Sequence, residues 1–122
     1  LENDIWELID SINVEDKKRS LLILNKLLSQ HVDSNYILSM LGRNLRLIFL
    51  TKELLNKGAD YGRIASVLKV PHFPVGSLVK SSKGYTQEKM KFIYSKLSNL
   101  DHQIKTGKID GPLGLTLICP YL

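Results

Sequence analysis

Apolar residues recur at intervals of three and four along most of this chain, the spacing that places side chains on one face of an α-helix. A short first helix is predicted over residues 3–12 and a second over residues 13–30. Asn13 is expected to cap the second helix, with Glu15 and Asp16 in its first turn, where acidic side chains interact favourably with the helix dipole. Leucine and isoleucine are so frequent in this second helix that little of it is expected to face water.

The longest helix is predicted from Asp33 or Ser34 to Lys57, with Gly58 as its stop. It carries apolar stripes on two faces. The stripes are Ile37, Leu41, Leu45, Ile48 and Leu55 on one face and Met40, Leu47 and Leu54 on the other. A helix that is apolar on two faces packs against neighbours on both sides, so this one is predicted to be the central element.

Residues 59–84 change in character because Pro71 and Pro74 interrupt the helical pattern. Two short helices are predicted on either side of these prolines, over residues 61–69 and 75–83. No alternating strand pattern competes with the helical one anywhere in the sequence. The fold class is therefore predicted to be all-α.

The last quarter of the chain begins with Thr86, which is expected to cap a long amphipathic helix with an apolar stripe that continues to Ile104. Asp101 and Lys105 lie four residues apart with the acid first, which is the favourable order for an ion pair on a helix. Gly107 follows as a left-handed helix stop. The pattern thus predicts a well-defined helix end.

A final apolar helix is predicted to start at Asp110, with Pro112 in its first turn, and to fray at Pro120. Together the elements predict a compact bundle of about five to seven helices that forms a single domain over residues 1–122. The chain begins with Leu1 rather than Met, so we expect it to be the C-terminal fragment of a longer protein.

The net charge of +5 is unevenly distributed between the two halves of the chain. Residues 1–60 carry eight Lys and Arg against nine Asp and Glu, whereas residues 61–122 carry nine against three. A basic half is typical of a surface that meets nucleic acid or an acidic protein, and equally of a lysine-rich face that meets only water. Charge alone leaves these alternatives open.

Composition also limits the chemistry. No uncharged apolar run approaches the roughly 18 residues of a membrane helix, and no segment resembles a signal peptide, so no membrane partner is expected. Cys119 cannot form an internal disulfide, which favours the cytosol.

His31, His72 and His102 lack neighbours at metal-ligand spacing, and residues 107–114 lack the Lys-Ser/Thr end of a phosphate-binding loop. We therefore expect no catalytic site, metal or cofactor.

Residues 63–80 place small and apolar side chains where a helix-turn-helix motif keeps them, which would direct the second helix into the major groove of DNA. Lys80 and Lys83 could then contact phosphates. However, Lys69 stands where the turn usually has glycine, and Pro74 shortens the second helix. A hairpin that only packs against the bundle is the alternative interpretation.

The order of motifs in the second half is the most specific signal. Ile-Ala-x-x-Leu-x-Val leads through the proline-interrupted turn to a Leu-Val-Lys helix, and the closing motifs come after it. These are Leu97-x-x-Leu100-Asp101-x-x-Ile104-Lys105-Thr106-Gly107-Lys108 and Leu115-Thr116-Leu117. The arrangement, over roughly Asp4 to Leu122, resembles the C-terminal domain of the delta subunit of the bacterial DNA polymerase III clamp loader. The chain departs from this family at Thr116, where an acid is frequent, and at Pro112 and Pro120.

The resemblance implies a collar domain, which joins the matching domains of the other clamp-loader subunits during DNA replication. It implies a non-catalytic subunit of the DNA polymerase III holoenzyme, a DNA-directed DNA polymerase and nucleotidyltransferase complex, in the bacterial cytoplasm. The sliding clamp would be bound through missing N-terminal domains, and primer-template DNA would be met indirectly.

The resemblance also selects residues. The candidates for family-specific packing, or for contacts with neighbouring subunits, are Leu97, Leu100, Asp101, Ile104, Lys105, Gly107, Leu115 and Leu117. The candidates for basic residues near DNA are Lys69, Lys80 and Lys83. Asp101 and Lys105 would orient the penultimate helix against the last helix or a neighbouring subunit, or would form an ordinary pair on the helix surface.

Overall fold

The computed structural model describes residues 2–69 and 75–122, which form seven α-helices and a final 3-10 turn. In order these are α1 (Glu2–Asn13), α2 (Lys17–Ser29), α3 (Ser34–Asn56), α4 (Tyr61–Leu68), α5 (Val75–Lys83), α6 (Gln87–Lys105), α7 (Gly111–Ile118) and η1 (Cys119–Tyr121). These ranges contain no strand, so the predicted all-α bundle is confirmed. No helix within them is both long and apolar enough to cross a membrane.

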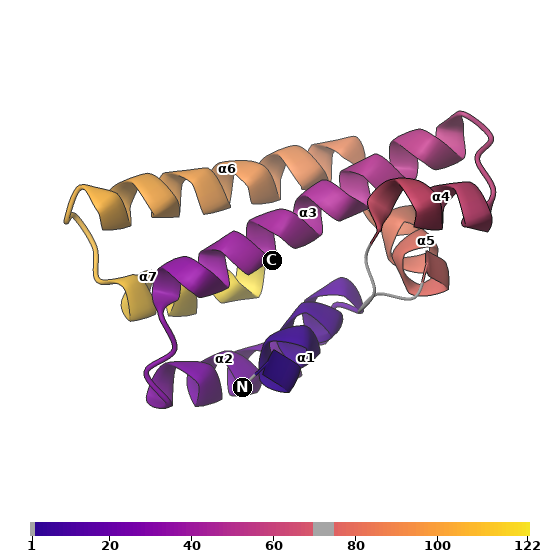
Figure 1. Ribbon diagram of the computed structural model, residues 1–122. Helices are drawn as coiled ribbons and strands as arrows, with labels where there is room; N and C mark the ends of the chain where they lie inside the picture. The colour runs from indigo at the N-terminus through magenta and orange to yellow at the C-terminus, as the bar shows by residue number, and fades with distance from the viewer. Residues whose placement is uncertain (1, 70–74) are drawn as a thin grey trace.

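Helix α3 is the central element, as its two apolar stripes predicted. It packs against α1, α4, α5, α6 and α7. Ile37 and Ile48 of the first stripe are fully buried, and Leu47 of the second is 7% exposed. Figure 1 shows α6 running beside α3, with α4 and α5 gathered at one end of α3 and α7 near the other.

The predicted helix caps form as expected at three positions. Asp33, Thr86 and Asp110 each accept a hydrogen bond from a backbone N–H in the first turn of the helix that follows. Gly58 and Gly107, the predicted stops, have positive φ angles of 82° and 72°. The ends of the long helices are therefore set by residues within one turn of them.

The start of α2 differs from the prediction. Asp16 is the cap and accepts a hydrogen bond from the backbone N–H of Arg19 at 3.1 Å. Asn13 is instead the last residue of α1, and its side-chain amide exchanges two hydrogen bonds with that of Asn44 on α3. Glu15 lies between the helices with a φ of 60°, outside the first turn of α2. The buried amide of Asn44 needs a partner, and Asn13 satisfies both its donor and its acceptor.

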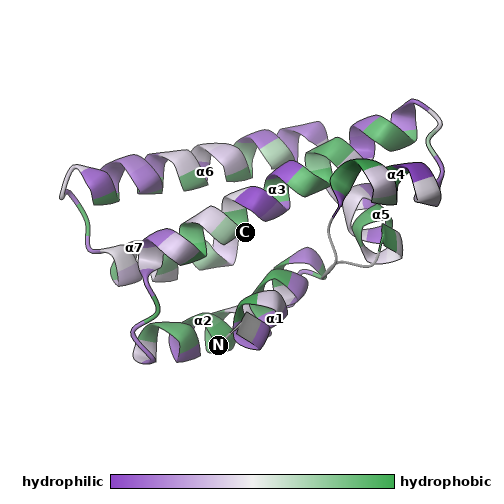
Figure 2. Ribbon diagram, viewed as in Figure 1, coloured by the Kyte–Doolittle hydropathy of each residue, from purple (hydrophilic) through white to green (hydrophobic). Residues whose placement is uncertain are grey.

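Helix α2 also exposes more apolar surface than its composition predicted. Leu22 is 63% exposed, although α2 packs against α1, α7 and η1. In Figure 2 green and purple alternate along α3 and α6 as well, in keeping with helices that bury some faces and expose others. The predicted proline-interrupted turn, residues 70–74, lies outside the described residues.

Candidate docking surface for other subunits

Helix α6 packs closely against α7 on one side. A Cβ atom at Gly114 of α7 would lie only 2.3 Å from Leu100 Cδ1 of α6. A Cβ at Gly111 would lie 2.7 Å from Ser34 Cβ at the start of α3. Leu115, the neighbour of Gly114 on α7, is 1% exposed. The two glycines therefore allow α7 to approach its neighbours more closely than any side chain would permit.

The structure divides the predicted packing residues into two groups. Those buried in the core of the domain itself are Leu97, Leu100 and Leu115. Ile104 is half-buried against this core, and Gly107 ends α6. Asp101, Lys105 and Leu117 reach the surface, so their side chains are the ones available to another protein.

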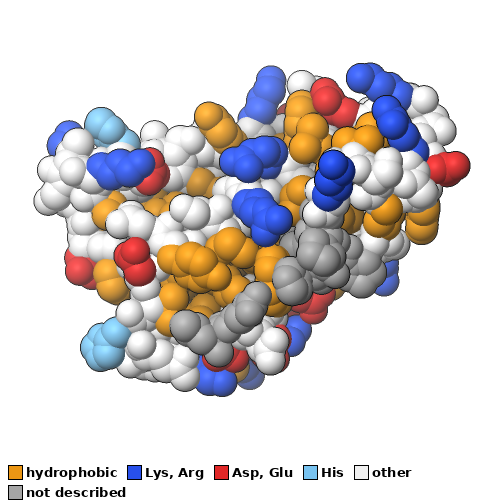
Figure 3. Space-filling view, viewed as in Figure 1, with side chains coloured by type: hydrophobic (Ala, Val, Ile, Leu, Met, Phe, Trp, Pro, Cys, Tyr) orange, Lys and Arg blue, Asp and Glu red, His pale blue; other side chains and the backbone are white. Residues whose placement is uncertain are grey.

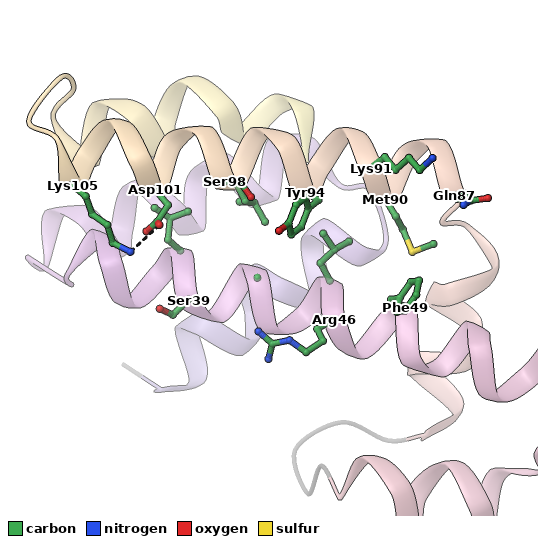
Figure 4. A pocket seen from close by; sticks show the side chains of 14 residues that line it. Ser39, Arg46, Phe49, Gln87, Met90, Lys91, Tyr94, Ser98, Asp101 and Lys105 are labelled. Carbon is green, nitrogen blue, oxygen red and sulfur yellow. Dashed lines mark hydrogen bonds and ion pairs between the residues drawn. The ribbon is translucent and has the colours of Figure 1, made fainter.

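A groove separates α6 from α3 along another side of α6 (Figure 4). Its volume is about 770 Å³, and both helices supply its walls. The lining residues are Leu38, Ser39, Gly42, Leu45, Arg46 and Phe49 of α3 and Gln87, Met90, Lys91, Tyr94, Leu97, Ser98, Asp101 and Lys105 of α6. The contact between α6 and α7 is closely packed, whereas the contact between α6 and α3 leaves this groove at the surface.

The groove combines buried apolar residues with exposed aromatic rings. Leu45 and Met90 are 8% and 9% exposed, whereas Phe49 and Tyr94 are 46% and 66% exposed. Gly42, near the middle of α3, also lines the groove, and a Cβ atom at this position would meet nothing within 4 Å. This combination resembles a protein-docking surface, where a large apolar side chain is more often buried by a partner than left in water.

Basic side chains predominate among the charged residues of the groove. Asp101 and Lys105 form an ion pair of 2.8 Å along α6 at one end of it. Arg46 and Lys91 form no ion pair with any other residue in the described ranges. Figure 3 shows the face with α3 and α6, where blue Lys and Arg side chains lie among orange apolar ones and few red ones.

A second apolar surface lies on α7 and η1. Leu113, Leu117 and Tyr121 are spaced four residues apart, and each is more than half exposed. Phe92 of α6 lies near Tyr121, with ring centroids 6.4 Å apart, and the ammonium group of Lys96 is 4.8 Å from the Tyr121 ring centroid. Lys96 therefore covers the aromatic rings, and Leu113 and Leu117 remain exposed beside them.

The predicted DNA-proximal lysines are all exposed. Lys69 caps the end of α4 with a φ of 50°, the conformation for which glycine is usual. Lys80 and Lys83 lie in the last turn of α5. The inner face of α5 is held to α3, where Lys52 Nζ donates a hydrogen bond to the Ser82 carbonyl at 2.9 Å. Helix α5 is thus part of the bundle and exposes its lysines.

The remaining chemistry does not indicate catalysis. Cys119 is buried, and burial raises the pKa of its thiol, which disfavours the nucleophilic thiolate. Within the described ranges no group of three or more His, Cys, Asp or Glu side chains could hold a metal ion. Cys119 therefore agrees better with a packing role than with a nucleophilic one.

The sequence pattern does not identify several of the groove residues, namely Gly42, Arg46, Phe49 and Tyr94. One signal was present in the sequence. A glycine in the middle of a long helix costs about 0.5–1 kcal/mol relative to alanine, so Gly42 required an explanation. The pairing of α3 with α6 could not be read from local pattern, and it is this pairing that forms the groove.

Comparison with known proteins identifies the family of this chain. Residues 2–120 match the family described as DNA polymerase III delta subunit, C-terminal domain. The chain is 34% identical over 117 residues to DNA polymerase III subunit delta of Bacillus subtilis (strain 168), covering 96% of this chain and 34% of the relative. The solved structure of the Bacillus subtilis DNA clamp loader delta protein (YqeN) matches with a TM-score of 0.83 and 33% identity, over 97% of this chain and 35% of that one. The chain thus spans about a third of the length of these relatives.

Proposed function

Because this chain belongs to the family formed by the C-terminal domains of DNA polymerase III delta subunits, we propose that it is the assembly domain of a bacterial clamp loader. The observation that carries the proposal is the family match, which runs over residues 2–120 and so includes all the α-helices of the described residues. The relatives are named as a subunit and as a clamp loader protein, in keeping with a non-catalytic role. The helix-turn-helix interpretation of residues 63–80 is not favoured, because the same match includes α4 and α5.

The proposal extends to the whole protein. The domain associates with other clamp-loader subunits in a collar, while parts of the protein outside this chain bind the sliding clamp. Exposed Lys69, Lys80 and Lys83 face primer-template DNA or an acidic neighbour, and the basic second half of the chain supports this placement. The assembly works in the bacterial cytoplasm as part of the DNA-directed DNA polymerase III holoenzyme.

Deletion of the domain tests the assembly role. Full-length delta and a version that lacks residues 2–120 are each mixed with the other purified loader subunits and separated by gel filtration. We expect the full-length protein to co-elute with the loader and the truncated protein to elute alone. Retained binding of the sliding clamp by the truncated protein is the control for its folding. Co-elution of the truncated protein to the same extent would overturn the proposal.

A further inference from the structure

We propose that the groove between α3 and α6 binds an amphipathic α-helix of a neighbouring clamp-loader subunit, with acidic residues beside the apolar stripe of that helix. The inference rests on the proposed assembly role and assigns it to one surface. The groove, its charges and the space at Gly42 each support this occupant.

The shape of the groove suits a helix. Its lining runs from Leu38 to Phe49 on α3 and from Gln87 to Lys105 on α6. At a rise of 1.5 Å per residue these stretches are about 16 and 27 Å long, or roughly three to five turns. An amphipathic helix bound in this groove would place its apolar stripe against the apolar residues that line it. The exposed rings of Phe49 and Tyr94 would then be removed from water.

The charge of the groove selects an acidic occupant. Lys105 is already paired with Asp101, which leaves Arg46 and Lys91 as cations without a carboxylate partner in the described part of the chain. Carboxylates on the flanks of a bound helix would complement these two cations, whereas a basic helix would be repelled. A second copy of this groove, facing the first, would bring the same two cations against each other.

Gly42 leaves space in the middle of the groove. Nothing lies within 4 Å of a Cβ atom built there, so packing inside the domain does not require the glycine. A side chain at this position would project into the volume that the partner helix needs, because Gly42 is itself a lining residue. Substitution at Gly42 therefore separates docking from folding.

The test uses full-length delta and measures its Kd for the purified loader subunits. Gly42→Leu fills the groove, and the double variant Arg46→Glu with Lys91→Glu reverses its charge. We expect each change to weaken binding at least tenfold. In the double variant added salt should strengthen binding instead of weakening it, because salt then screens a repulsion between carboxylates. The matched control is Lys18→Glu with Lys108→Glu, which makes the same change of charge at exposed sites outside the groove and should change Kd less than twofold.

The outcomes are distinguishable. Normal binding by both groove variants, together with loss of binding on deletion of residues 2–120, would overturn the groove proposal and leave the assembly role in place. Loss of binding by Gly42→Leu alone would overturn the acidic occupant. An equal loss in the control variant would show that only overall charge matters, which also contradicts the proposal. Circular dichroism melting curves confirm that each variant is folded.

Discussion

The two glycines Gly114 and Gly42 lie beside the same helix, α6, in opposite surroundings. At Gly114 a methyl group would lie 2.3 Å from Leu100, whereas at Gly42 it would meet nothing within 4 Å. The first glycine closes a contact inside the domain, and the second keeps a groove open. Helix α6 therefore has a closed side, formed with α7, and an open side, formed with α3. The α7 side of α6 is therefore packed within the domain itself, whereas the α3 side is the one that we propose for a partner.

The closed side is the more sensitive to added volume. Gly114→Ala is expected to lower the free energy of unfolding by about 1–3 kcal/mol, because Leu100 is 2% exposed and has little room to move. Urea unfolding followed by circular dichroism measures the loss. Combining it with Leu100→Ala should cost less than the two single changes added together, since the clash is removed. If the two changes in the free energy of unfolding were strictly additive, the two sites would not be in contact.

A pH effect is expected at Tyr85, which lies just before the start of α6. Tyr85 is 2% exposed, and its hydroxyl donates a hydrogen bond to Asn13 Oδ1 at 2.9 Å. Burial first, and the charge of Glu15 second, raise the pKa of Tyr85 to about 12. The unfolded chain ionises near pH 10, so the stabilisation is complete below that pH and is lost as pH rises toward 12.

Urea unfolding at pH 9 and pH 11 measures this loss. At pH 11 we expect the free energy of unfolding to be lower by about 1.4 kcal/mol, which corresponds to one pH unit above the unfolded pKa. In Tyr85→Phe this contribution should disappear, because the group that titrates is gone. An unchanged pH slope in that variant would assign the effect to another residue.

The open side should respond to added volume with the opposite sign. Gly42→Ala is expected to raise the free energy of unfolding by about 0.5–1 kcal/mol, because alanine lowers the entropy cost of forming α3 and meets no neighbour. Thermal and urea unfolding both measure the change, with Gly114→Ala as the comparison. Destabilisation by Gly42→Ala would show that the groove is closed in solution.

The smallest effect is expected at the end of the groove. Asp101 and Lys105 are 44% and 68% exposed as side chains, so their pair stabilises α6 by only about 0.3–0.5 kcal/mol. A double-mutant cycle with Asp101→Asn and Lys105→Gln measures this coupling, which should vanish in 1 M salt. A coupling above 1 kcal/mol would point to a structural role beyond the surface of the helix.

The features of the fold that depend on near neighbours in the chain could be predicted from the sequence, whereas those that depend on distant residues could not. The order of the helices and most of their ends followed from the sequence, and so did the resemblance to the delta family, now confirmed by the match over residues 2–120. The cap of α2 was assigned to Asn13 instead of Asp16, because the distant partner of Asn13 was not visible in the sequence. The exposure of Leu22 was missed for a related reason, since periodicity cannot show how many neighbours a helix has.

The sequence by itself determined the local features of this protein. Thr86, Gly107 and Asp110 act within one turn of a helix, so their effect depends on near neighbours in the chain. Only the tertiary structure joined Asn13 to Tyr85, 72 residues away, and Glu15 to Lys89. It also gave Gly42 and Gly114 their opposite roles, because the space around a glycine depends on which helices meet there.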